Sequence, residues 1–145
     1  MQINFTVYGE PKGKARPRFV RTSRGVRTYT PKQTETYQND VLCAYLNKYK
    51  GTTLKGQIWA RIDAYFAIPK STPKYKRPLM HWYDKKPDVD NIAKSILDAL
   101  NGAAYDDDKQ VVALMIHKEY SDTPRVDIKL GDINDDTRGT DTSYI

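Results

Sequence analysis

The sequence predicts a single α+β domain in which a mixed β-sheet carries its helices on one face. Two observations support this fold class. The chain has 145 residues, which is the length of one ordinary domain. Segments in which apolar and polar residues alternate are interspersed with segments of helical spacing. They give the order β-α-β-α-β-β over residues 1–131, followed by an acidic tail at 132–145 that we expect to be disordered.

The first half of the chain is predicted to form two strands and a helix. Apolar residues occupy every second position in Ile3–Val7 and again in 57–68, which is the period of a half-buried strand. The basic segment 9–29 contains glycine and proline at intervals, so we expect a loop or a loose hairpin there. A helix is expected from Pro31 to about Tyr49, because Thr30 can cap its first turn and proline favours the first helical position.

The second half begins with residues 69–87, which hold four prolines and are expected to form a solvated loop. The next helix is predicted at 90–101, where apolar residues recur at helical spacing. A strand at 111–120 is expected to be buried on both faces at its start. It then turns at 121–124 into an antiparallel partner strand at 126–130.

The charges are divided unevenly along the chain. The net charge is +6, but residues 1–86 carry 18 Lys and Arg against 5 Asp and Glu, a net charge of +13. Residues 87–145 carry 6 against 13, a net charge of −7. Positive charge that neutralises phosphates releases condensed counterions, so the basic half indicates a polyanionic partner.

Composition argues against a membrane or secreted protein. No stretch approaches the roughly 18 apolar residues that a membrane span needs. Met1 is followed by neither a basic nor an apolar signal region, so secretion is not expected. The single Cys43 can close no internal disulfide, which fits a reducing compartment. We therefore expect a cytoplasmic protein without a membrane partner.

Several common catalytic sites are also disfavoured. The segment Gly9–Ala15 has neither the spacing nor the final hydroxyl residue of a phosphate-binding loop, and no other motif indicates a small-molecule cofactor. His81 and His117 lack partners at zinc-ligand spacing. Cys43 lies within the first predicted helix, where we expect a small core residue rather than a nucleophile.

The residues that favour chemistry are carboxylates. Asp88 and Asp90 lie two residues apart where the loop enters the second helix, and Lys94 follows Asp90 by one helical turn. The run Asp106–Asp108 comes after this helix, although the sequence does not determine which end of the helix it meets. The structural alternative is that Asp88 or Asp90 caps the helix and Asp106–Asp108 forms a solvated turn.

Hard oxygen ligands of this kind suit Mg²⁺ or Mn²⁺. Such a metal can activate water and neutralise the charge that develops on a phosphodiester during cleavage. Lys94 could stabilise the leaving oxygen. Together with the basic half of the chain, these carboxylates predict metal-dependent cleavage of a nucleic acid.

At these residues the chain resembles the RusA family of Holliday-junction resolvases, small endonucleases of bacteria, prophages and phages. The family pattern RPDxDNxxKxxxDAL is matched by residues 86–100, with Lys86 in place of the usual Arg. The following DDxQV pattern is matched by Asp107-Asp108-Lys109-Gln110-Val111. Residues 13–18 and the helix start at Tyr29-Thr30-Pro31 resemble the branch of the family found in Gram-positive bacteria and their phages.

The resemblance implies a cytoplasmic homodimer that grips a four-way DNA junction and, with Mg²⁺, makes paired nicks in opposed strands. Asp88, Asp90 and Asp108 then correspond to the metal ligands, with Asp107 as the alternative to Asp108, and Lys94 is the catalytic lysine. A nuclease for other branched DNA and a non-catalytic DNA-binding protein are the alternative functions.

The basic residues of the two predicted loops are the candidate DNA contacts, because arginine and lysine can follow a phosphate backbone without reading bases. These residues are Lys12, Lys14, Arg16, Arg18, Arg21, Arg24, Arg27, Lys74, Lys76 and Arg77.

Overall fold

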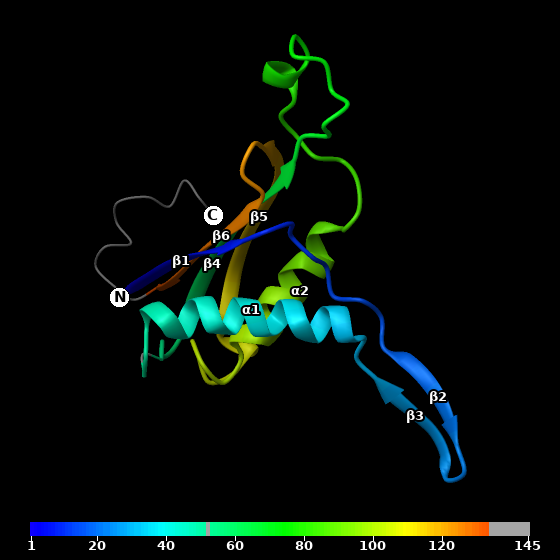
Figure 1. Cartoon of the computed structure of the whole chain (residues 1–145). Coiled ribbons are helices and arrows are strands. Elements are labelled where there is room, and N and C mark those ends of the chain that lie inside the picture. Colours follow the sequence, from blue (N-terminus) through cyan, green and yellow to red (C-terminus); the bar gives the residue numbers. More distant parts are fainter. Residues whose placement is uncertain (52, 134–145) are drawn as a thin grey trace.

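The computed structural model describes residues 1–51 and 53–133, which form one α+β domain (Figure 1). A four-stranded sheet in the order β1-β6-β4-β5 carries the two α-helices on one face, and β2 and β3 form a separate hairpin. The bounds in chain order are β1 Gln2–Tyr8, β2 Arg18–Thr22, β3 Gly25–Tyr29, α1 Lys32–Lys48, β4 Ile58–Ala67, the short 3-10 helix η1 Arg77–Leu79, α2 Val89–Leu100, the 3-10 helix η2 Asp108–Gln110, β5 Val111–Ser121 and β6 Arg125–Asp132. The predicted fold class is confirmed, and segment 9–29 contains the hairpin that was one of its two expected forms.

The sheet is mixed, as predicted. Strand β6 runs antiparallel to β1 and β4, whereas β4 and β5 are parallel. The alternating apolar residues of β1, β4 and β6 are buried in the core, and Phe5, Ile62 and Ile128 lie beside one another across these three strands. Helices α1 and α2 complete this core with side chains that include Val41 and Ile96. One face of the sheet is therefore covered by helices.

Strand β6 is not the neighbour of β5, so the predicted pairing of these two strands is wrong. Strand β6 instead pairs on one edge with β1 and on the other with β4, and its apolar residues are at most 1% exposed. Strand β5 lies at the edge of the sheet instead. Its Val112 is 56% exposed and its Leu114 is 44% exposed, so the expected burial of both faces at its start is also wrong.

Two local predictions in the first helix are corrected as well. Thr30 does not cap α1, because Pro31 has an extended ψ of 142° and itself occupies the capping position without a side-chain bond. The Pro31 carbonyl accepts hydrogen bonds from the Thr34 and Glu35 amides and so begins the helix. Cys43 is exposed rather than part of the core.

Within residues 1–51 and 53–133, no helix combines the length and the apolar character needed to cross a membrane. The tail predicted from residue 132 lies outside the described residues except for Asp132, which ends β6, and Ile133.

Candidate active site

The start of α2 presents the first two candidate carboxylates. Asp88 precedes the helix in an extended conformation, with φ −70° and ψ 153°, and its side chain makes no capping hydrogen bond. Asp90 lies in the first turn, and Lys94 follows one turn later. All three side chains are exposed. Because the Asp88 carboxylate is not used to cap the helix, it remains available to a ligand.

The first basic segment packs directly on this end of α2. The Lys14 amide donates a hydrogen bond of 2.9 Å to the Asn91 carbonyl. At Gly13 an added Cβ would lie 2.7 Å from the Cβ of Pro87 and 3.1 Å from that of Asn91, so only glycine allows this approach. The loop 68–88 enters α2 at the same place (Figure 1). Both basic segments therefore meet beside Asp88 and Asp90.

Lys14 has a structural partner inside the chain. Its ammonium group lies 2.6 Å from the Asp98 carboxylate in the last turns of α2, and each side chain is one-third exposed. The ion pair fastens the basic segment along α2. Among the predicted DNA contacts from Lys12 to Arg27, Lys14 is the one that forms an ion pair within the described part of the chain.

Lys12 and Arg16 lie in the segment between β1 and β2 and are exposed, whereas the remaining predicted DNA contacts lie on two projecting segments. Arg18, Arg21, Arg24 and Arg27 belong to the β2–β3 hairpin and are exposed. In the loop before α2, Arg77 lies 3.2 Å from Asp122, which anchors the loop to the β5–β6 turn. Lys74 and Lys76 are exposed on the same loop.

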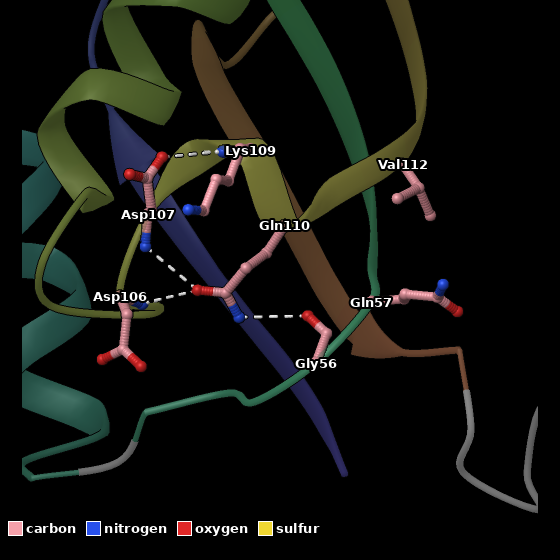
Figure 2. Close-up of a pocket in the computed structure, with 7 residues that line it drawn as sticks. All are labelled: Gly56, Gln57, Asp106, Asp107, Lys109, Gln110 and Val112. Carbon is pink, nitrogen blue, oxygen red and sulfur yellow. Dashed lines mark hydrogen bonds between the residues drawn. The ribbon is translucent and has the colours of Figure 1, made fainter.

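The turn Asp106–Asp108 is held by Gln110 (Figure 2). The Gln110 side-chain oxygen accepts hydrogen bonds from the Asp106 and Asp107 amides at 2.9 and 3.0 Å. Its side-chain nitrogen donates to the Gly56 carbonyl at 3.0 Å, which ties the turn to the segment before β4. The Asp107 carboxylate in turn accepts from the Lys109 amide, completing a capping box around η2. Sequence reasoning missed this role of Gln110, although the Asp-x-x-Gln spacing is its signal.

These contacts shift the pKa values of the two neighbouring carboxylates in opposite directions. The hydrogen bond from the Lys109 amide lowers the pKa of Asp107. The hydrogen bond with Asp107 raises the pKa of Asp108, and partial desolvation and the charges of Asp107 and Asp98 act in the same direction. The Asp107 carboxylate is thus engaged as the cap of η2.

Asp108 lies at the opposite end of α2 from Asp88 and Asp90. Its electrostatic neighbour on the helix is Asp98, in the last turns, and the 12-residue helix is about 18 Å long. Within the part of the chain that the structure describes, no three His, Cys, Asp or Glu side chains are close enough to share a metal ion. One copy of the chain brings together Asp88, Asp90 and Lys94, but not Asp108.

A pocket of about 730 Å³ opens beside the η2 turn. It lies between the segment before β4 and the first residues of β5, so it borders both the capped turn and the edge of the sheet (Figure 2). Its lining residues are Gly56, Gln57, Asp106, Asp107, Lys109, Gln110 and Val112.

Replacing Gln110 by Ala is expected to destabilise the turn. The substitution removes the partner of two amides and of the Gly56 carbonyl, and since water can replace it at the two exposed positions we expect a cost of about 1 kcal/mol. Thermal unfolding measures the loss. Gln57→Ala, in the same pocket, is the matched control and should leave the melting temperature nearly unchanged. Equal melting temperatures for the two variants would contradict the role of the Gln110 hydrogen bonds.

Comparisons with known proteins identify the family of the chain. A family model described as Endodeoxyribonuclease RusA matches residues 8–131, which include both candidate carboxylate segments. An uncharacterized protein named YqaN, from Bacillus subtilis (strain 168), is 33% identical over 138 residues, covering 91% of this chain and 97% of the relative. The match to the family model places the chain in a class of endodeoxyribonucleases. The chain belongs to the RusA family.

Proposed function

We propose that the protein is a Mg²⁺-dependent endonuclease that resolves four-way DNA junctions by paired nicks in opposed strands. The observation that carries this proposal is the grouping of two exposed carboxylates and Lys94 on the first turns of α2, where two basic segments meet. Family membership supports cleavage of DNA, and the basic half of the chain supports a large polyanionic substrate.

The donor set at the start of α2 fits Mg²⁺, which binds proteins through one or two carboxylates and completes its shell with water and phosphate. Asp88 and Asp90 would hold the ion, and Mn²⁺ suits the same ligands. When bound, the metal would activate water and neutralise charge on the scissile phosphate. Lys94, one turn further along the helix, would stabilise the negative charge on the leaving oxygen.

A homodimer would bring Asp108 into the same site. Four-way junctions are cut symmetrically, so two equivalent sites in a two-fold dimer suit the reaction. Since Asp108 lies at the far end of α2 in its own chain, we infer that it serves the site of the second copy. Each active site would then combine Asp88, Asp90 and Lys94 of one copy with Asp108 of the other.

The edge of β5 is the surface that supports this dimer. Its second half is covered, because the Tyr83 amide bonds to the Lys118 carbonyl and the Tyr120 amide to that of His81. Its first half has no strand partner on the outer edge within the described residues, and it exposes Val112 and Leu114.

An antiparallel pairing of two β5 edges centred on residues 112–114 would set the second copy's η2 near this copy's Lys118. The Lys118 ammonium donates to the Pro87 carbonyl at 2.9 Å, beside Asp88. The pairing would therefore bring the second copy's Asp108 toward Asp88 and Asp90, and it would also cover an apolar sheet edge.

Cleavage of synthetic DNA tests the function. The wild-type protein is expected to nick a four-way junction in the presence of Mg²⁺, to leave linear duplex of the same sequence largely intact, and to release no product in EDTA. Flaps and replication forks in the same panel test the alternative of a nuclease for other branched DNA. Binding without cleavage in either Mg²⁺ or Mn²⁺ would identify a non-catalytic DNA-binding protein instead.

Replacing Lys94 by Ala should slow cleavage by about 10²–10³-fold, because one donor to the developing charge is lost. Lys94→Arg retains the charge and should recover part of the rate. Lys50→Ala, at an exposed position after α1, is the matched control. Single-turnover rates at saturating protein provide the measurement, and unchanged cleavage by Lys94→Ala would remove this lysine from the mechanism.

A further inference from the structure

The β2–β3 hairpin, residues 18–29, stands away from the rest of the domain (Figure 1). Every residue of its two strands except Thr22 is exposed. An isolated two-stranded hairpin is at best marginally stable in water. This one also exposes large apolar side chains, namely Phe19, Val20, Val26 and Tyr29. Such a combination indicates a surface that is completed by a binding partner.

Each face of the hairpin combines apolar and basic side chains. Successive residues in a strand point to opposite faces, and residues paired across the two strands share a face. By this register, one face carries Phe19, Arg21, Val26 and Thr28. The opposite face carries Arg18, Val20, Arg27 and Tyr29. Phe19 is the most exposed of the apolar residues in the hairpin, at 73%.

The charge of the hairpin indicates which kind of partner it binds. Four arginines lie in 18–29, and the sequence contains no carboxylate between Glu10 and Glu35. A second copy of the hairpin would therefore be repelled, whereas a polyanion would be attracted. A two-stranded ribbon also has the width that a DNA groove or an opened branch point admits.

We propose that this hairpin binds at the branch point of the DNA substrate and that Phe19 stacks on a base left unpaired there. The inference rests on the proposed function for the branched substrate. Arginines alone would hold any duplex, because phosphates are the same in every DNA. An exposed aromatic ring adds a preference for unpaired bases, since stacking requires a free base face. Phe19 thus contributes to selection of the junction, and the arginines to general affinity.

Binding in EDTA separates these two contributions without cleavage. The probes are a four-way junction with 2-aminopurine at the branch point and a linear duplex of the same sequence. Phe19→Ala is expected to bind the junction about tenfold more weakly and to bind the duplex as the wild type does. The change in 2-aminopurine fluorescence on binding should shrink for this variant, whereas Phe19→Trp keeps a stacking ring and should retain the wild-type affinity for the junction.

Two further variants serve as controls. Leu46→Ala removes an exposed apolar side chain from α1, outside the hairpin, and should change neither affinity nor fluorescence. Arg21→Gln removes a phosphate contact on the Phe19 face and should weaken binding to both DNAs. Circular dichroism verifies that each variant is folded.

Equal affinities of Phe19→Ala and wild type for the junction, or equal losses on junction and duplex, would overturn the stacking role. Either result leaves the proposed nuclease function intact, because cleavage is measured separately in Mg²⁺. Conversely, a wild-type protein that shows Phe19-dependent junction binding but never cleaves would refute the nuclease function and support the hairpin's role.

Discussion

Replacing Asp90 by Asn is expected to abolish junction cleavage while leaving junction binding intact. Asp90 is exposed in the first turn of α2, so the isosteric amide should cost little stability. The amide is a weaker ligand for Mg²⁺ and lacks the negative charge that holds the cation. Losing several kcal/mol of metal-dependent stabilisation of the transition state slows the reaction by about 10³-fold or more. Binding should stay the same or tighten, since one negative charge near the phosphates is removed.

The matched control for this experiment is Asp84→Asn. Asp84 is exposed on the loop that leads into α2 and carries the same charge, so its removal reproduces the electrostatic change without touching the proposed ligands. Gel-shift titration in EDTA and single-turnover cleavage in Mg²⁺ provide the two readouts. If Asp90→Asn cleaved the junction as fast as Asp84→Asn, Asp90 would be no metal ligand.

Sequence periodicity is sufficient to predict the type and bounds of an element that has one clearly apolar face. Strand β4 was expected at 57–68 and spans Ile58–Ala67, and α2 was expected at 90–101 and spans Val89–Leu100. Periodicity reports which face of a strand is buried, but it says nothing about which strand lies alongside. The position of β6 between β1 and β4 depends on pairing between distant parts of the chain, so the local pattern predicted the wrong neighbour for it.

The same distinction applies to the candidate site. The proximity of Asp88, Asp90 and Lys94 follows from helical spacing alone, so it was predictable. The ion pair between Lys14 and Asp98 joins residues that are 84 positions apart, and no local pattern indicates it. The connection between α2 and β5 is short, so β5 begins beside the last turn of the helix. Asp108, just before this strand, therefore lies far from the start of α2.

Mixing two inactive variants is expected to restore cleavage if each site is shared between two copies. In a dimer of Asp90→Asn with Asp108→Asn, one site would carry both substitutions. The other site would combine the intact Asp90 of the second variant with the intact Asp108 of the first. At equal amounts with free exchange, about a quarter of the wild-type number of sites is recovered. Since only one site per mixed dimer is active, the product should be a nicked junction rather than a resolved one.

The matched control is a mixture of Asp90→Asn with Asp88→Asn. Both residues precede or begin the same helix, so each site of the mixed dimer carries one substitution and no activity should return. Differently tagged copies verify that exchange has occurred. If exchanged dimers of Asp90→Asn with Asp108→Asn remained inactive, Asp108 would not act across the dimer. In that case the separation of Asp108 from Asp88 and Asp90 would exclude it from the metal site, and catalysis would rest on the two carboxylates and Lys94 of one chain.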